Sequence, residues 1–536
     1  MTTSSTAEIT GANLISGAPS ALGPADVVQV RPRTGEPAGP AFHSATAEEV
    51  RAAVAAAEAA APVLARTSGK VRAALLRDVA DRLDAATDRL VAVADEETAL
   101  GETRLRGEVA RTSGQLRMFA DLVERGEHLD AVIDTADPSA TPSRPDLRRM
   151  CIPLGPVAVF GASNFPFAFS TAGGDTASAL AAGCPVVVKA HPAHPATSEL
   201  TARIVLDALA AAGLPAGCFS LLHGAGPEVG LELVRAPGIT AVGFTGSTRA
   251  GRALADAAAA RPVPIPVYAE MGSTNPVVIT PAALAARGEA IAAGLAASFT
   301  LGNGQFCTKP GVVLLPADEA ARTFVELLAG HVRQMQPGVA LTPQIRTGLL
   351  EQLTTTRRLP GVEVVAEVPA TGTGLGVPVV VLRADATAYL EHEELREEHF
   401  GPVVVLVECA DDAERDAVLR AVPGSLTATL HAEPEEAELL APLVEQLSRL
   451  AGRLVWNGFP TGVAVTAAQH HGGPYPATTA PWTTSVGTAA IRRFLRPVVY
   501  QDAPQSVLPR ALRDDNPDGV PRLVDGVLQR GPLGER

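Results

Sequence analysis

Hydrophobic residues recur at intervals of three and four positions from residue 47 to about residue 126. The segments that carry this pattern are ATAEEVRAAVAAAEAAAPVLA and VRAALLRDVADRLDAATDRLVAVADEET. Such spacing gives a helix one apolar side that it can bury. A Pro-, Ser- and Thr-rich stretch, DTADPSATPSRPD, then interrupts the pattern. We predict scaffold helices followed by an exposed loop or a hairpin arm.

From residue 153 to residue 270 the pattern changes to short β-branched runs separated by helical stretches. The predicted strands are VAVF (157–160), VVVK (186–189), FSLL (219–222), ITAVGF (239–244) and VPIPVYAE (263–270). This alternation is typical of a parallel sheet, which binds ligands at the carboxyl ends of its strands. A second α/β pattern runs from residue 280 to about residue 463, with predicted strands VVLL, VPVVVL, VVVLVE and RLVWNGF.

The composition is that of a globular protein. Of 536 residues, 46% are hydrophobic and 19% charged, which is enough for several domains. The formal net charge of -14 has no basic cluster to offset it, and this argues against nucleic acid or a membrane surface as a partner. The cysteines stand far apart without any CxxC, so we predict neither disulfides nor a metal site. Without a signal-like N-terminus or an apolar run of membrane-spanning length, we expect a cytoplasmic protein.

Two residues are candidates for covalent chemistry. The stretch SFTLGNGQFCTKPG holds Cys307 after flexible glycines that allow the backbone to approach a ligand. The alternative is an inert loop thiol, because burial keeps a thiol protonated. The stretch VYAEMGSTNP places Glu270 at the end of a predicted strand. Poor solvation there would raise the pKa of its carboxyl toward the range of a general base, although an ion-paired boundary residue is the alternative.

Other candidates follow predicted strands. In GASNFPFAFS the amide of Asn164 can stabilise an oxyanion or cap the next helix. Lys189 ends the strand VVVK, where it faces a phosphate or a ribose or is merely exposed. In FTGSTRAG, Gly246 and Ser247 open a helix that suits a pyrophosphate, and Ser247 is equally an N-cap. The dinucleotide fingerprint GxGxxG is missing.

Two further stretches read as ordinary surface on local grounds. In EELREEHFGPVVVL, Glu398 lies in a charged run typical of a solvated helix end. His470 and His471 in AAQHHGGPYPATT lack a third ligand at metal spacing, so we interpret them as loop residues.

Taken together, the motifs resemble those of the aldehyde dehydrogenase superfamily over residues 47 to about 500. They are SNFP (163–166), VVVKAHPAHPAT (186–197), GFTGS (243–247), AEMGSTNP (269–276), GQFCT (304–308) and EEHFGP (397–402). The stretches HGGPYPATT and TSVGTAAIRRFLRPVVYQ are similar to the branch of bacterial α-ketoglutaric semialdehyde (2,5-dioxopentanoate) dehydrogenases, which also resembles an NADP-dependent fatty aldehyde dehydrogenase.

The resemblance implies a role for each candidate. Cys307 would attack the aldehyde, Asn164 would hold the oxyanion, and Glu270 would activate the water that hydrolyses the thioester. The cofactor would contact Lys189, Gly246, Ser247, Glu398 and Phe400. The substrate would contact Arg111, Phe167, Phe459 and His471.

Departures from the family pattern adjust these expectations. Pro192 stands where many NAD-preferring members carry a glutamate, so we predict that NADP is preferred and that NAD is possible. Ser485 stands where a second acid is often found, which leaves Glu270 as the stronger candidate base. A 2,5-dioxopentanoate carboxylate would pair with Arg111. The alternatives are a fatty aldehyde, for which Phe165, Phe167 and Phe169 could form an apolar funnel, and a cofactor-independent thiol hydrolase or acyltransferase.

The resemblance also implies an architecture. We predict an α/β protein with a Rossmann-like cofactor domain (1–131 and 154–270) and an α/β catalytic domain (271–470). A small β element (132–153 and 484–503) would join subunits into a homodimer or homotetramer, and residues 504–536 would form a C-terminal extension.

Overall fold

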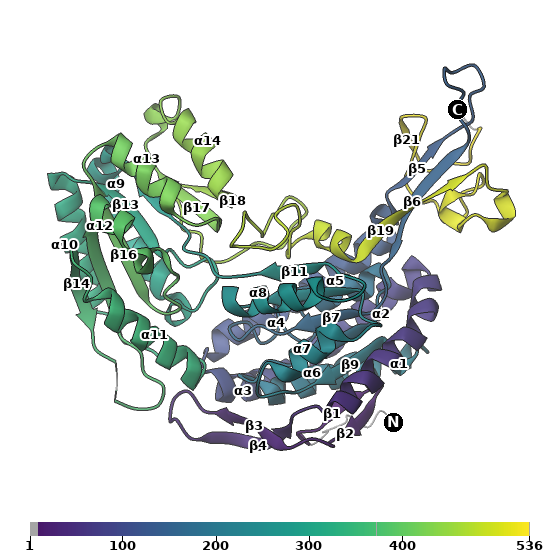
Figure 1. Ribbon diagram of the computed structural model, residues 1–536, viewed down its shortest axis with the longest axis horizontal. Helices are drawn as coiled ribbons and strands as arrows, with labels where there is room; N and C mark the ends of the chain where they lie inside the picture. The colour runs from purple at the N-terminus through teal and green to yellow at the C-terminus, as the bar shows by residue number, and fades with distance from the viewer. Residues whose placement is uncertain (1–8, 371, 535–536) are drawn as a thin grey trace.

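The computed structural model describes residues 9–370 and 372–534. Its strands form two large sheets side by side, a smaller sheet on an arm that projects from the body, and a two-stranded ribbon, β3 (Ala25–Val30) with β4 (Pro37–His43) (Figure 1). The helices lie on the faces of the two large sheets (Figure 1). The α/β class predicted from the alternating pattern is therefore confirmed.

The predicted N-terminal helices are present as α1 (Ala47–Arg66), α2 (Gly69–Ala85), α3 (Thr87–Thr98) and α4 (Glu102–Glu124). Helix α1 begins at a capping box in which Thr46 accepts from the Glu49 amide and Glu49 accepts from the Thr46 amide. These bonds satisfy amides that have no partner inside the helix. The apolar stripes of the four helices face the first sheet, as their periodicity predicts.

The first sheet has the order β11-β10-β7-β8-β9-β1-β2. Strands β7 to β11 run parallel, and β1 and β2 extend the sheet antiparallel at one edge. Its strands are β1 (Asn13–Ile15), β2 (Ala18–Ser20), β7 (Val157–Phe160), β8 (Val186–Lys189), β9 (Phe219–Leu222), β10 (Ala241–Thr245) and β11 (Val267–Glu270). The connecting helices are α5 (Gly174–Ala182), α6 (Pro195–Ala211), α7 (Glu228–Arg235) and α8 (Thr248–Ala259).

Both faces of this sheet are buried, because alternate residues of each strand enter different cores. Val157 and Val159 pack with α2, α4, α5 and α6, whereas Ala158 and Phe160 pack with α1, α7 and α8. A strand covered on both faces is apolar throughout, which explains the continuous VAVF and VVVK runs. The strand predicted over 263–270 is shorter than expected and begins at Val267.

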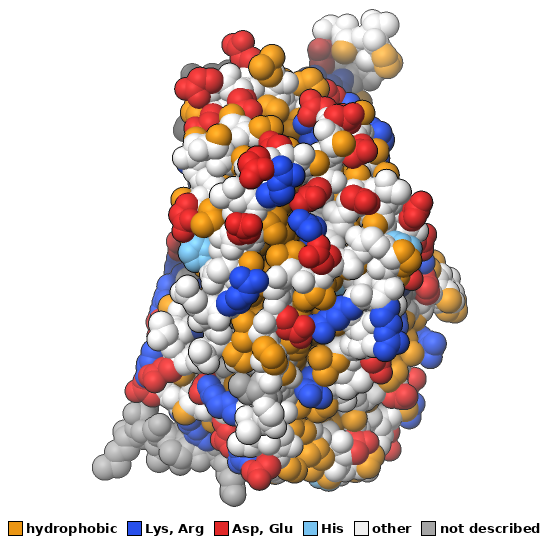
Figure 2. Space-filling view, turned by 90° about the vertical axis from the view of Figure 1, so that its left-hand side faces the viewer, with side chains coloured by type: hydrophobic (Ala, Val, Ile, Leu, Met, Phe, Trp, Pro, Cys, Tyr) orange, Lys and Arg blue, Asp and Glu red, His pale blue; other side chains and the backbone are white. Residues whose placement is uncertain are grey.

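The second sheet has the order β14-β15-β16-β13-β12-β17-β18. Its strands are β12 (Val277–Ile279), β13 (Val312–Pro316), β14 (Val362–Val368), β15 (Val379–Asp385), β16 (Val403–Cys409), β17 (Ser425–His431) and β18 (Ala451–Trp456). Its helices are α9 (Pro281–Thr300), α10 (Glu319–Arg333), α11 (Pro343–Thr356), α12 (Ala386–Glu391), α13 (Asp412–Ala421) and α14 (Ala441–Leu450). Helices α9 and α10 cover one face and α11 to α14 the other. The outer surface of this half intersperses basic and acidic side chains (Figure 2).

The third sheet has the order β19-β6-β5-β20-β21 and forms the projecting arm (Figure 1). Its strands are β5 (Ala131–Asp134), β6 (Leu147–Pro153), β19 (Leu495–Gln501), β20 (Arg522–Val524) and β21 (Val527–Gln529). The tail expected as a separate extension thus contributes two strands to this sheet. Buried Arg148 ties the tail to the arm through Asp146 and Asp514. The domain boundaries themselves stay a prediction.

The topology brings the candidate residues to one place. Lys189 and Glu270 stand at the ends of β8 and β11, and parallel strands present their carboxyl ends at the same edge. The chain passes directly from β11 into β12 of the second sheet, so this edge faces the second half of the molecule (Figure 1). Within the described residues, no helix is both long and apolar enough to cross a membrane.

Candidate active site

Cys307 lies on a loop that follows α9 and is fixed from two sides. Gly304 has a φ of +67° and lies against the backbone of Gly401, where an added Cβ would come within 2.2 Å of the Gly401 carbonyl. Only glycine fits that conformation and that contact. On the other side the amide of Asn275 donates to the backbone oxygens of Cys307 at 2.8 Å and Lys309 at 2.9 Å. These contacts fix the position of the glycine-rich loop that carries the Cys307 thiol.

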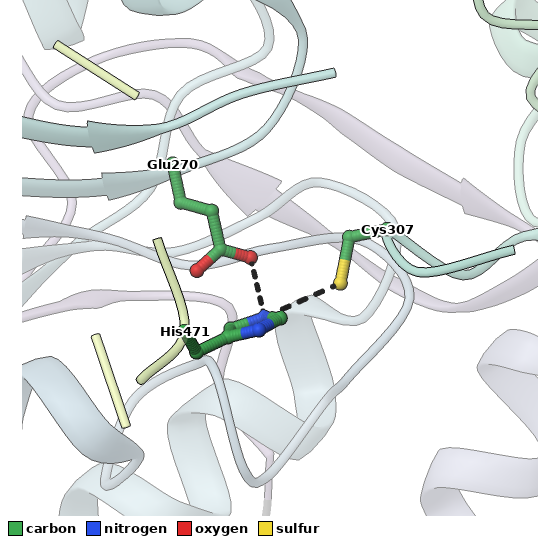
Figure 3. Close-up of side chains that lie close together, drawn as sticks. All are labelled: Glu270, Cys307 and His471. Atoms are coloured by element: carbon green, nitrogen blue, oxygen red, sulfur yellow. Dashed lines mark hydrogen bonds and ion pairs between the residues drawn. The ribbon is translucent and has the colours of Figure 1, made fainter. Parts of the chain in front are cut away.

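The thiol of Cys307 shares its surroundings with Glu270 and His471 (Figure 3). The distance from Cys307 Sγ to His471 Nε2 is 3.6 Å, and that from His471 Nε2 to Glu270 Oε1 is 2.9 Å. His471, expected as a loop residue at the substrate, lies in an irregular segment and is only 1% exposed. It is a buried side chain held between the thiol and the carboxylate, because the irregular segment after β18 folds back onto β11.

The charges of this group differ from the sequence-based expectation. Burial raises the pKa of the Glu270 carboxyl, but the ion pair and hydrogen bond with His471 and the hydrogen bonds from Ser485 and Cys307 outweigh it, so the pKa is lowered. The prediction of a raised pKa is wrong because the sequence did not reveal these partners. Burial and the nearby carboxylates of Glu270 and Glu398 raise the pKa of the Cys307 thiol well above its ordinary value. The resting site therefore holds a protonated thiol beside a charged carboxylate.

Ser485 completes the environment of Glu270. Its hydroxyl donates to Glu270 Oε2, and its amide donates to the His471 carbonyl at 2.9 Å. A cavity of about 10 Å³ lies behind these side chains, bordered also by Thr478, Thr483 and Arg493. That volume is close to the minimum for one water molecule, and the polar lining offers it hydrogen bonds. Ser485 thus fixes the carboxylate from the position at which the resemblance led us to expect a second acid.

Asn164 points toward the loop of the thiol. Its Nδ2 donates to the carbonyl of Gln305 at 2.9 Å, two residues before Cys307. One of the two amide protons is committed by this bond, which leaves the other for a ligand. The carbonyl of Asn164 accepts from Arg104 Nη2 at 2.6 Å. Arg104 therefore links helix α4 to the turn that carries Asn164.

Arg111 and Arg104 form a wall with three phenylalanines. The Arg111 guanidinium carbon lies 5.2 Å from the ring centre of Phe169 and 5.6 Å from that of Phe165. The Arg104 carbon lies 4.5 Å from the ring centre of Phe306 and 5.2 Å from that of Phe165. Burial lowers the pKa of Arg111, although the nearby carboxylates of Glu108 and Glu270 oppose the shift. Arg111 Nε and Nη2 and Arg104 Nη1 are buried without a hydrogen-bond partner in the described part of the chain. Buried unpaired donors are costly unless a ligand or water satisfies them.

Two aromatic residues expected to contact the substrate pack against the hydrophobic cores of the two large sheets. Phe167 is 1% exposed and belongs to the core between the first sheet and its helices, because its neighbours Phe165 and Phe169 take the positions beside the arginines. Phe459 packs with the core of the second sheet, where its ring centre lies 4.9 Å from that of His431 and its edge meets Gly294 of α9.

The edge of the first sheet fits a dinucleotide. Ser247 caps α8 by accepting from the Ala250 amide at 3.3 Å, so the N-terminal turn of that helix opens beside the ends of β10 and β11. The Gly246 amide already donates to the Glu270 carbonyl at 3.0 Å, so it is not a free donor for a ligand. Because Gly246 has no side chain, a ligand can approach its backbone closely. Lys189 is half-buried, and burial lowers the pKa of its ammonium to about 8. A cationic side chain and a helix N-terminus at one sheet edge suit a phosphorylated ligand.

Glu398 lies at the boundary between the two halves. A Cβ added to Gly272 would come within 2.6 Å of Glu398 Oε2, so the carboxylate crosses directly over the segment that leaves β11. Burial raises the pKa of Glu398 to about 7, although Lys309 and the Ser273 amide oppose the shift. Phe400, two residues further on, is half-buried. Glu398 therefore lies at the boundary between the two halves of the molecule, whereas the local sequence suggested a solvated helix end.

Three residues of the site were not predicted from the sequence, namely Arg104, Phe306 and Lys309. Arg104, Glu108 and Arg111 are spaced by four and three positions on α4, a spacing that puts them on one face and was a readable signal. Lys309 is 1% exposed, and its ammonium donates to the Val403 carbonyl at 2.8 Å. No local pattern distinguishes it from a surface lysine, because its burial depends on the neighbouring strand β16.

A parallel sheet whose ligand-binding edge faces a cysteine, a carboxylate and an amide offers the groups that covalent catalysis requires. The chain belongs to the aldehyde dehydrogenase family, whose model matches residues 23–474. It is therefore an oxidoreductase that acts on aldehydes with a nicotinamide cofactor.

Named relatives and solved structures agree with this assignment. The chain is 48% identical over 525 residues to α-ketoglutaric semialdehyde dehydrogenase 2 of Azospirillum brasilense, covering 97% of this chain and 100% of the relative. It is 42% identical to the α-ketoglutaric semialdehyde dehydrogenase of Acinetobacter baylyi, covering 97% and 99%. Its fold matches aldehyde dehydrogenase C of Pseudomonas syringae, solved with NAD+ and octanal, with a TM-score of 0.79, 23% identity and coverage of 92% and 97%.

Proposed function

We propose that this enzyme oxidises 2,5-dioxopentanoate to 2-oxoglutarate with NADP as the preferred cofactor. The observation that carries the proposal is the pair of unpaired guanidinium nitrogens of Arg111 in the wall with Phe165 and Phe169. The activities named for two relatives that match 97% of the chain support it. A guanidinium binds a carboxylate through two parallel hydrogen bonds, and this substrate carries a carboxylate at the end opposite its aldehyde.

The first step adds Cys307 to the aldehyde carbon. Because the raised pKa of the thiol keeps it protonated, a base must take its proton as the S–C bond forms. The Glu270 carboxylate is charged and has an oxygen within 4.8 Å of the thiol sulfur, so it receives this proton, with His471 Nε2 adjacent to both groups. The carbonyl oxygen becomes an oxyanion, which the free amide proton of Asn164 and the Cys307 backbone amide stabilise.

The second half of the reaction releases the product. A bound nicotinamide supplies the acceptor for the hydride that leaves the thiohemiacetal carbon. Glu270, which Ser485 holds in place, first releases the thiol proton to solvent. A water molecule then hydrolyses the resulting thioester, its proton passes to Glu270, and the expelled Cys307 thiolate is reprotonated. In total, the aldehyde, the oxidised cofactor and water give the carboxylate, the reduced cofactor and two protons.

The preference for NADP rests on charge at the sheet edge. Lys189 ends β8 and supplies a cation, and Pro192 offers no carboxylate to repel a 2′-phosphate. Ser247 and the first turn of α8 would hold the pyrophosphate, while Glu398 and Phe400 would face the nicotinamide ribose. These residues fit the cofactor, because each lies at the sheet edge or at its boundary with the second half.

A fatty aldehyde is the second candidate, and the ring contacts of Phe165 with Phe169 and Phe306 favour it. These rings offer apolar surface to an alkyl chain. The arginines discriminate between the candidates, because an apolar chain would leave their buried N–H groups unsatisfied.

We further propose a homodimer or homotetramer in the cytoplasm, built through the arm. The edge strands β18 and β19 carry exposed apolar side chains at Trp456 and Val499, and exposed edge strands pair readily with another chain. Within each subunit, the half built on the first sheet would bind the cofactor, and the half built on the second sheet would carry the nucleophile. Light scattering on the purified protein measures the assembly, and a monomer would contradict the proposal.

The decisive experiment compares kcat/KM for 2,5-dioxopentanoate, short semialdehydes and long aliphatic aldehydes with NADP and NAD. We expect 2,5-dioxopentanoate with NADP to give the highest value. A higher value for a long aliphatic aldehyde would replace the proposed substrate, and equal values for both cofactors would contradict the proposed preference.

A further inference from the structure

Three side chains at the nucleophile have the ligand chemistry of a metal site. The sulfur of Cys307, the Nε2 of His471 and a carboxylate oxygen of Glu270 all lie within 4.8 Å of one another (Figure 3). Thiolate, imidazole and carboxylate are the ligands that Zn²⁺ prefers in proteins. The sequence showed only adjacent histidines, because Cys307 and His471 stand 164 positions apart and meet only in the fold.

Two of the three separations between the ligand atoms are close to those around a tetrahedral ion, and the third, from Cys307 to Glu270, is within 4.8 Å. Bonds of about 2.3 Å to sulfur and about 2.0–2.2 Å to nitrogen and oxygen put the ligand atoms roughly 3.2–3.7 Å apart. The observed separations are 3.6 Å from Cys307 Sγ to His471 Nε2 and 2.9 Å from His471 Nε2 to Glu270 Oε1. The first already matches, and the second requires a small opening of the His471–Glu270 pair.

The surroundings supply what a metal site needs beyond its ligands. Ser485 donates to Glu270 Oε2, which orients the carboxylate and leaves Oε1 toward His471. His471 is 1% exposed and held by the donation of its amide to Thr484 Oγ1 at 2.8 Å. The three protein ligands leave a fourth position open for water.

We propose that Glu270, Cys307 and His471 bind one Zn²⁺ ion reversibly and that this binding switches the enzyme off. The thiol proton leaves to solvent as the Zn–S bond forms, and no electron is transferred. The bound ion occupies the sulfur that must attack the aldehyde and the carboxylate that must receive a proton. The inhibition depends on the proposed role of Cys307, whereas the binding does not.

Co²⁺ is the spectroscopic probe, since it takes the same ligands and reports on them. Full-length enzyme, freed of metal and of thiol reductants, is titrated with Co²⁺ and then with Zn²⁺. We expect about one ion per chain and a thiolate-to-cobalt charge-transfer band that Zn²⁺ abolishes. The Cys307→Ser variant should lose the band, and His471→Gln should weaken Zn²⁺ binding at least about tenfold. A wild-type protein without the band would overturn the proposal.

Cys151→Ser is the matched control, because Cys151 is also half-buried but lies on β6 of the arm. It should bind Zn²⁺ as the wild type does, and loss of binding in this variant would place the ion elsewhere and refute the site. Aldehyde oxidation is measured separately in chelator-treated buffer, then with added Zn²⁺, then after EDTA. Inhibition that EDTA reverses supports the switch, whereas full activity with Zn²⁺ bound overturns it. Failure to oxidise aldehydes in metal-free buffer would instead refute the proposed function.

Discussion

The two sides of the candidate active site are built in opposite ways. On the reacting side, Glu270 Oε2 accepts from Ser485 and Glu270 Oε1 lies 2.9 Å from His471 Nε2, so the carboxylate is held by neighbouring side chains. On the wall, Arg104 and Arg111 bury guanidinium nitrogens without partners in the described residues, over phenylalanine rings. The contacts of Glu270 hold its carboxylate in place, whereas the unpaired guanidinium donors of the wall gain free energy only when a ligand arrives. Reactivity and specificity are therefore carried by separate groups, and substitutions can test that separation.

Removal of the thiol should have the largest effect. We expect Cys307→Ala to lower kcat by roughly 10⁴-fold or more with every aldehyde, because the covalent step is lost. The dissociation constant for NADP, measured by fluorescence titration, should stay within about twofold. Cys151→Ala, on the arm, should leave kcat unchanged. Turnover retained in Cys307→Ala would refute the nucleophile assignment.

Glu270→Gln should come second, with kcat lower by about 10²- to 10³-fold. The amide cannot accept a proton, so the thioester should accumulate and appear as a burst of reduced cofactor followed by slow turnover. Stopped-flow absorbance at the cofactor band measures this. Glu351→Gln, an exposed position on α11, serves as the control. Steady-state turnover that matches the wild type would exclude Glu270 as the base.

Arg111→Met tests the wall and should change specificity and not chemistry. We expect kcat/KM for 2,5-dioxopentanoate to fall about 10- to 100-fold, the loss of a charge-assisted hydrogen-bond pair, while hexanal is affected less than about threefold. Arg104→Met should instead impair both substrates, since Arg104 holds the Asn164 carbonyl. Equal losses for both substrates in Arg111→Met would break the proposed division between reactivity and specificity.

The smallest effect concerns pH and the cofactor. Burial lowers the pKa of Lys189 to about 8, so the side chain is charged below that pH and loses its charge as the pH rises through it. The KM for NADP should therefore rise about tenfold from about pH 7 to about pH 9, and the KM for NAD should rise less. Lys189→Arg should flatten the NADP profile, because a guanidinium stays charged. Identical profiles for both cofactors would remove Lys189 from the phosphate site.

Sequence patterns were sufficient for the elements and for the family, because both depend on local order. The period of the apolar residues predicted α1 to α4, and continuous β-branched runs predicted β7 and β8, since strands buried on both faces need no polar positions. The motif around Cys307 is likewise recognised from residues that are adjacent in the sequence. Phe167 shows the limit, because alternate residues of one turn face different sides and the sequence does not say which side holds the substrate.

Tertiary structure alone decided how the candidates meet. The direction of the Glu270 pKa shift follows from His471 and Ser485, which lie about 200 positions later in the chain and approach only because the segment after β18 returns to β11. The burial of Lys309 depends in the same way on β16. Charge, desolvation and hydrogen bonding act over a few ångströms of space, whatever the separation along the chain. The sequence thus determined which groups are present, and the fold determined their protonation, their partners and their reach.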